Sequence, residues 1–122
     1  MTQKTIKITG WVLTIIIGLL LGLSASLKLV QSEETVAQAA AMGIDSKTYL
    51  IIGIIEIASL ILFIIPRTGI VGTLLLAAYF GGAIATHLMH QQPVIIAVSV
   101  QVLIWITAFI RFPELRQRIF RQ

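Results

Sequence analysis

The sequence has no cysteine, and charged residues are scarce. Without cysteine there are no disulfides, no thiol redox catalysis and no metal sites built on thiolates. Only 11% of the residues are charged, whereas an ordinary soluble domain has about 25%. With 57% hydrophobic residues and a mean hydropathy of +0.98, the apolar surplus is too large for one soluble core. Lipid must therefore face much of the surface.

The chain contains four apolar runs, each about as long as a membrane span. A helix rises about 1.5 Å per residue and the hydrocarbon core is about 30 Å thick, so about 20 apolar residues cross it. The sequence predicts an all-α fold, a four-transmembrane-helix bundle forming a single domain of residues 1–122. The predicted spans are residues 8–30, 48–65, 70–89 and 94–110.

The first span has a second interpretation. Its basic start, its apolar core and Ser24-Ala25-Ser26 also fit a secretory signal peptide with a small-residue cleavage site. We favour the spanning helix, because matches to such a cleavage pattern are loose.

The segments between the spans carry helix and turn signals. Ser32 is placed to cap a short surface helix that Gly43 ends. Residues 66–69 form a turn, and Pro93 opens the fourth span. Residues 111–122 are predicted to form a basic amphipathic helix on an anionic leaflet, with a frayed basic tail as the alternative.

The basic residues gather on one side of the predicted bundle. Four spans place both termini on the same side, which holds seven of the nine basic residues. The positive-inside rule makes that side cytoplasmic, in a multi-pass protein of a bacterial-type cell membrane. Short basic runs beside apolar spans serve as membrane anchors, so no nucleic acid is expected as a partner. The seven are Lys4, Lys7, Arg67, Arg111, Arg116, Arg118 and Arg121.

Glu56 is an acidic residue near the middle of the second span. A charge at the bilayer midplane costs about 2.5–3.5 kcal/mol on insertion scales, so this side chain needs a partner or a proton. Tyr79 and Gln101 lie at a similar depth in the third and fourth spans. Because intramembrane ionisable groups usually face a bundle interior, we expect these three side chains to line a cavity.

Three further polar residues lie toward the outer ends of the spans. Lys28 is near the end of the first span, and Thr86 and His87 are near the end of the third. We expect them at the outer mouth of the cavity. The ligand-binding residues predicted from the sequence are Lys28, Glu56, Tyr79, Thr86, His87 and Gln101.

Several of these residues also have a purely structural interpretation. Glu56 would then be a protonated hydrogen-bonding group, and Lys28 would extend to the outer headgroups. Tyr79 would be core packing, and Gln101 would join two helices through hydrogen bonds.

The sequence predicts neither a metal site nor a catalytic centre. His87 and His90 have the spacing of a metal-binding pair, but further histidine and cysteine ligands are lacking. No nucleophile–base pair or cofactor motif is visible, so a stand-alone enzyme is the least favoured class. No cofactor is predicted apart from a bound quinone or lipid.

The order and spacing of several short motifs resemble the DoxX / DoxX-like family of small four-helix integral membrane proteins. The resemblance covers nearly the whole chain. Its motifs are Ser24-Ala25-Ser26-Leu27-Lys28-Leu29, Met42-Gly43-Ile44, Gly53-Ile54-Ile55-Glu56, Pro66-Arg67, Gly81-Gly82-Ala83 and Thr86-His87-Leu88.

The resemblance implies a four-helix bundle related to small membrane folds that bind hydrophobic ligands. Some members are small subunits of a thiosulfate:quinone oxidoreductase, and others associate with oxidative-stress proteins. By resemblance, the positions to carry over are Lys28, Glu56, Thr86 and His87. The lack of cysteine argues against thiol-based sulfur chemistry in this chain.

Three functions remain open from the sequence. The first is binding of a small lipophilic molecule, quinone- or lipid-like, by an accessory subunit of a membrane oxidoreductase. The second is a membrane scaffold or assembly factor whose buried polar groups are structural. The third is a proton-coupled transporter, which would need a homo-oligomer because four spans are few for alternating access.

Overall fold

The computed structural model describes residues 2–120, and all regular structure in this range is helical. Arg121, which we assigned to the basic side, lies outside the described residues. The elements are α1 Gln3–Leu29, α2 Glu33–Ala41, α3 Ser46–Ile64, η1 Pro66–Thr68, α4 Gly69–Met89, α5 Ile95–Arg111 and α6 Pro113–Phe120.

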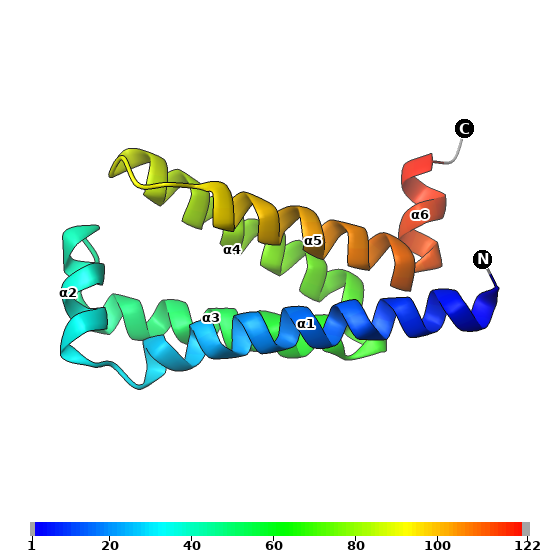
Figure 1. The fold of residues 1–122 in the computed structure, drawn as a ribbon, viewed down its shortest axis with the longest axis horizontal. Coiled ribbons are helices and arrows are strands. Elements are labelled where there is room, and N and C mark those ends of the chain that lie inside the picture. Colours follow the sequence, from blue (N-terminus) through cyan, green and yellow to red (C-terminus); the bar gives the residue numbers. More distant parts are fainter. Residues whose placement is uncertain (1, 121–122) are drawn as a thin grey trace.

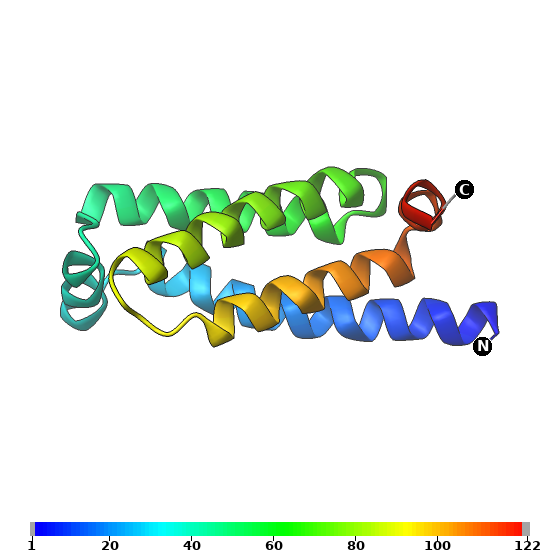
Figure 2. The same ribbon diagram turned by 90° about the horizontal axis from the view of Figure 1, so that it is seen from above.

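The long helices form two layers, with α1 and α3 in one and α4 and α5 in the other (Figure 1). Between the layers, α3 packs against α4 and α1 packs against α5 (Figure 2). The short helix α2 lies across one end, where the α4–α5 loop also lies. Both ends of the described chain, η1 and α6 lie at the opposite end.

Among residues 2–120, three helical segments are long and apolar enough to cross a membrane: α1, α3, and η1 together with α4. The helix α5 has 17 residues, and α6 continues from it after a bend of 102°. If α5 and α6 count as one broken span, the number of candidate spans rises to four.

The helix ends follow from local capping groups. Ser32 caps α2 by accepting a hydrogen bond from the Thr35 amide, and Gly43 after α2 has a φ of +75°. Glycine adopts this left-handed conformation without strain. The prediction for Pro93 is corrected: α5 begins at Ile95, and Val94 is its N-cap. Pro93 therefore belongs to the preceding loop.

The hydrophobic core occupies mainly the half of the bundle near η1. At Gly72 a Cβ atom would lie 2.1 Å from the Phe63 backbone nitrogen, so α3 and α4 are in backbone contact there. Toward α2 the two layers move apart (Figure 1). Accordingly, α4 has no buried residue after Phe80, and α5, which is described in full, has none before Ile104.

Two arginines close the η1 end of the bundle. Arg111 donates to the carbonyl oxygens of Phe63 at 2.8 Å and Ile64 at 2.9 Å. These carbonyls are at the C-terminus of α3, where helical partners run out. Arg116 of α6 donates to the Ile110 carbonyl at 2.9 Å, near the end of α5. Both cations thus satisfy helix C-termini, where the helix dipole also favours positive charge.

Candidate functional site

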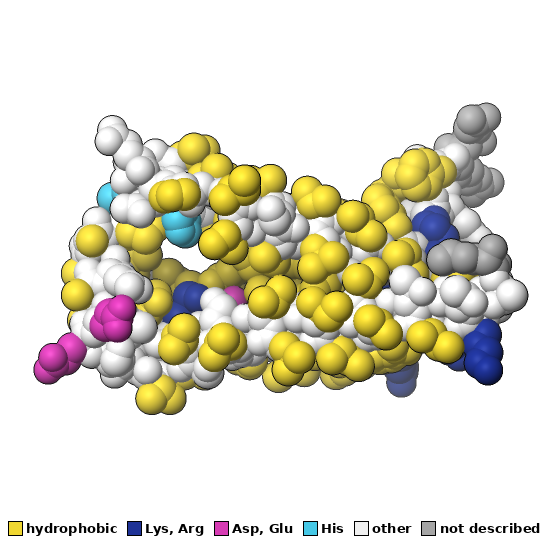
Figure 3. Space-filling view, in the orientation of Figure 1, with side chains coloured by type: hydrophobic (Ala, Val, Ile, Leu, Met, Phe, Trp, Pro, Cys, Tyr) yellow, Lys and Arg dark blue, Asp and Glu magenta, His cyan; other side chains and the backbone are white. Residues whose placement is uncertain are grey.

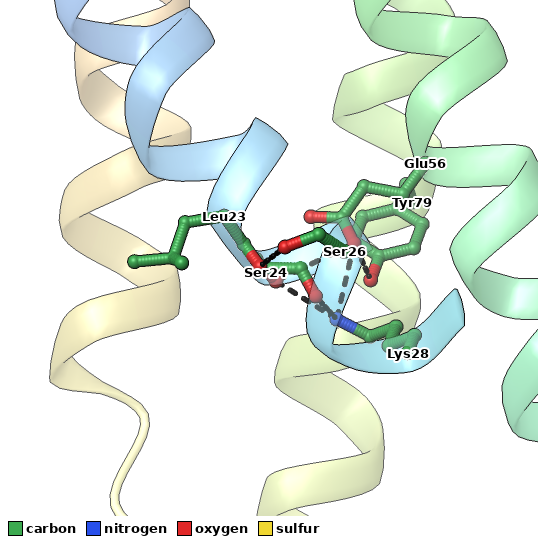
Figure 4. Close-up of polar contacts among 6 residues, drawn as sticks. All are labelled: Leu23, Ser24, Ser26, Lys28, Glu56 and Tyr79. Atoms are coloured by element: carbon green, nitrogen blue, oxygen red, sulfur yellow. Dashed lines mark hydrogen bonds and ion pairs between the residues drawn. The ribbon is translucent and has the colours of Figure 1, made fainter. Parts of the chain in front are cut away.

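Glu56 is buried inside the bundle with 1% of its surface exposed. Its Oε1 atom accepts hydrogen bonds from Lys28 Nζ at 3.0 Å and Tyr79 Oη at 3.1 Å. A third, longer one comes from Ser24 Oγ at 3.4 Å. The donors belong to α1 and α4, so three helices meet at this one carboxylate (Figure 4).

The position of Lys28 depends on a glycine. Gly53 lies one turn before Glu56 on α3, and a Cβ atom there would lie 2.7 Å from Lys28 Cβ. The missing side chain lets α1 come close enough for the ammonium group to reach the carboxylate. On α1 itself, Ser24 Oγ accepts from Lys28 Nζ at 2.8 Å, which fixes the lysine from its own helix.

The expected place of Lys28 is therefore corrected. Its side chain is 13% exposed and forms an ion pair with Glu56, instead of standing only at the outer mouth or extending to the headgroups. The physical reason is its long, flexible side chain, which reaches down the bundle from the last turns of α1.

The second carboxylate oxygen of Glu56 is buried without a partner. Oε2 makes no hydrogen bond within the described residues. A buried polar atom without a partner costs about 1–3 kcal/mol, more for a charged group. The cluster thus has an unused hydrogen-bond acceptor.

A cavity of about 570 Å³ opens beside this cluster, where the two layers diverge. Ser24, Lys28, Glu56 and Tyr79 form its polar part. Apolar side chains from α2, α3, α4 and α5 form most of the rest, among them Met42, Ile52, Phe80 and Ile96. In Figure 3 the hollow is visible, with basic and acidic side chains at its base and histidine near its rim.

The sequence model of the DoxX-like family matches residues 12–109. The chain belongs to the DoxX-like family. No curated protein and no solved structure gives a significant match. Membership of this family and the long apolar helices together show that this is a membrane protein. The six residues predicted to bind a ligand all lie inside the matched range.

Thr86 and His87 line the cavity of this DoxX-like protein, as expected. Their polar atoms also bond to their own helix: Thr86 Oγ1 donates to the Gly82 carbonyl at 2.8 Å. His87 Nδ1 is 2.7 Å from the Ala83 carbonyl oxygen. Since a carbonyl oxygen only accepts, Nδ1 carries a proton and donates this hydrogen bond.

The predicted position of Gln101 in the cavity wall is wrong. Gln101 is not among the lining residues. Its Nε2 donates to the Ala77 carbonyl at 3.2 Å and joins α5 to α4, while its Oε1 is buried without a partner in the described chain. A helical wheel gives the face of a residue but not the tilt of its helix, and the tilt decides this contact.

Sequence reasoning missed several lining residues of the DoxX-like cavity. Ser24 stands four residues before Lys28, a spacing that places both on one helical face. Tyr49 presents its ring to Lys28, with Nζ 5.7 Å from the ring centroid. Gln38 comes from the connector helix α2 and Met42 is its C-cap, and the sequence contains no signal that this connector contacts the cavity.

The arrangement is suited to holding a polar group and to exchanging a proton. The Lys28 ammonium group and the Tyr79 phenol both donate hydrogen bonds to the Glu56 carboxylate. Among residues 2–120 there is no group of three His, Cys, Asp or Glu side chains placed to hold a metal ion.

Proposed function

We propose that this DoxX-like protein binds a small lipophilic molecule, quinone- or lipid-like, in the cavity beside Glu56. The observation that carries the proposal is the buried Glu56 carboxylate, whose Oε2 has no partner in the described chain. A hydroxyl group of a ligand, such as that of a quinol, would donate to this cluster.

The chemistry of the cavity supports a lipophilic ligand. A buried ion pair contributes little net stability compared with apolar side chains of similar volume. The Lys28–Glu56 pair is therefore poorly explained as a stabilising device. The polar base would hold a head group, and the wall residues, such as Phe80 and Ile96, would pack against an apolar ring or chain. A protein that holds a quinone in this way would serve as an accessory subunit of a membrane oxidoreductase.

Two neighbouring glycines offer a matched test. Gly82 lines the cavity and Gly81 does not, and at both positions a Cβ atom would meet nothing within 4 Å. Gly82→Leu would fill the cavity, whereas Gly81→Leu makes the same change outside it. With decylubiquinol as probe, we expect Gly82→Leu to weaken binding by about tenfold, equivalent to about 1.4 kcal/mol. Gly81→Leu should bind like the unmodified protein.

Native mass spectrometry of the detergent-extracted protein is the measurement, since it also reports lipophiles that co-purify. Glu56→Gln is expected to lose the probe, with Glu114→Gln as the control for an exposed carboxylate. Thermal unfolding of each variant shows that it is folded. Equal binding by the two leucine variants, or no bound lipophile in any sample, would contradict the proposal and favour a scaffold.

A further inference from the structure

A second cavity, of about 580 Å³, lies at the opposite end of the molecule. It opens between the first turns of α1, the end of α5 and the start of α6. We call it the basic crevice. Its charged lining residues are Lys4, Lys7, Arg111, Arg116 and Glu114.

The crevice has an excess of positive charge that the described chain does not neutralise. Four cations and one carboxylate line it. Within residues 2–120 the only ion pair is that of Lys28 with Glu56, so none of these four cations is paired there. In Figure 3, basic side chains gather at this end of the molecule.

The two arginines are already held in place and still have donors to offer. Arg111 uses Nη1 and Nη2 for one carbonyl each, and Arg116 uses Nη1 alone. A guanidinium has five N–H donors in a fixed planar arrangement. Each arginine therefore keeps N–H groups for another acceptor. Such planar donors match the oxygens of a phosphate group.

The apolar part of the crevice indicates where its ligand comes from. Trp11 stacks on Arg111, whose Cζ is 4.8 Å from the ring centroid, and Ile6 and Ile110 complete the wall. The crevice thus adjoins the apolar surface of α1 and α5. Basic pockets between membrane helices are places where anionic lipid head groups bind.

We infer that the basic crevice binds a phosphate group, carried by the head group of an anionic phospholipid or by a free phosphate ion. The site is separate from the Glu56 cavity and does not depend on its function. Its four cations all lie outside residues 12–109, the range that the family match covers.

The test uses the full chain in detergent, with native mass spectrometry and three probes: phosphatidylglycerol, phosphatidylcholine and inorganic phosphate. Lys4 and Lys7 are exposed, so Lys4→Gln/Lys7→Gln is expected to fold. Each basic residue near a lipid surface contributes about fivefold in affinity, so this variant should bind about 25-fold more weakly. Glu114→Gln, which removes the only lining carboxylate, should bind about fivefold more tightly.

Arg67→Gln/Arg118→Gln is the matched control. It removes the same amount of positive charge from the same end of the folded molecule, but neither residue lines the crevice. The site is supported if the lysine variant loses the binding of phosphatidylglycerol or of inorganic phosphate and the control keeps it. The probe that binds then identifies the source of the phosphate group. The inference would be overturned by equal losses of binding in both double variants or by no binding of any probe. It would also be overturned if phosphatidylcholine were retained as well as phosphatidylglycerol.

Discussion

At the scale of single residues, Glu56 is tolerated because the protein supplies its counter-charge. An unpaired carboxylate in hydrocarbon would be protonated or would destabilise the fold. Lys28 provides a positive charge at 3.0 Å, and Tyr79 and Ser24 add hydrogen bonds. All of them reach Oε1 and leave Oε2 without a partner in the described chain.

The Lys28–Glu56 pair leads to a prediction of strong coupling. Glu56→Leu leaves a buried ammonium group unpaired, and Lys28→Met leaves a buried carboxylate. Breaking a buried pair costs about 3–5 kcal/mol, whereas replacing both partners with apolar residues costs far less. We expect the double variant to be more stable than either single variant, measured by denaturant unfolding in detergent. Additive losses would mean that the two charges do not interact.

Asp45 leads to a prediction about acid stability. Its carboxylate caps α3, accepting a hydrogen bond from the Thr48 amide at 2.8 Å. The hydrogen bonds with Thr48 lower the pKa of Asp45 below its ordinary value of 3.8. The capping contribution is therefore present above pH 3.8 and is lost as the pH falls through the lower, folded-state pKa.

The variant Asp45→Asn keeps a capping oxygen but does not titrate. Thermal unfolding measured between pH 5 and about pH 2 should show a smaller loss of stability for this variant than for the unmodified protein. An identical acid dependence in both proteins would contradict the role assigned to Asp45.

At the scale of elements, the approach of α3 and α4 depends on Gly72. An added Cβ atom would lie 2.1 Å from the Phe63 nitrogen and 2.4 Å from its Cα, so backbone atoms would have to move. Overpacking of a tight contact costs about 1–3 kcal/mol or more. We expect Gly72→Ala to lower the thermal unfolding temperature, while Gly81→Ala, with open space around it, does not. Equal stability of the two variants would show that the helices can separate without cost.

Most of the elements could be predicted from the sequence, because runs of apolar residues bounded by caps and prolines specify helices locally. The helices of the first three predicted spans begin and end within a few residues of the expected positions, apart from the early start of α1 at Gln3. The fourth predicted span, residues 94–110, also agrees with α5 to within one residue at each end, and only the assignment of Pro93 to its start was wrong, because Pro93 fits both the loop and a first helical turn. These errors concern ends, where local signals are ambiguous.

The candidate site was less predictable than the helices. The proximity of Glu56 and Tyr79 could be predicted, since the depth and the helical face of a residue both follow from its position along a helix. The prediction that Gln101 lines the cavity failed because helix tilt and rotation are set by packing. Lys28 was misplaced because its long side chain bridges several ångströms. The part played by α2 in the cavity arises only when the chain folds back over the bundle.

At the scale of the whole molecule, the distribution of charge predicts an orientation. Basic residues cluster at the end that carries α6, and the acidic residues Glu33 and Glu34 begin α2 at the other end. By the positive-inside rule, we expect the α6 end to face the cytoplasm and α2 to face outward. The absence of cysteine makes this testable, since a single introduced cysteine is the only thiol.

Glu34→Cys on α2 and Gln117→Cys on α6 are suitable reporters, because both positions are exposed. In intact cells, a membrane-impermeant maleimide should label Glu34→Cys and leave Gln117→Cys unlabelled until the membrane is permeabilised. The reverse pattern would place α2 inside.

The shortness of α5 has a consequence for the surrounding lipid. Its 17 residues span about 25 Å, several ångströms less than a hydrocarbon core of about 30 Å. The 27 residues of α1 reach about 40 Å, more than enough to cross. If α5 crosses the bilayer by itself, acyl chains beside it compress, at a cost of a fraction of a kcal/mol per ångström of mismatch. Two copies that bring their α5 sides together would share one thinned patch, so the bilayer itself would draw them toward each other.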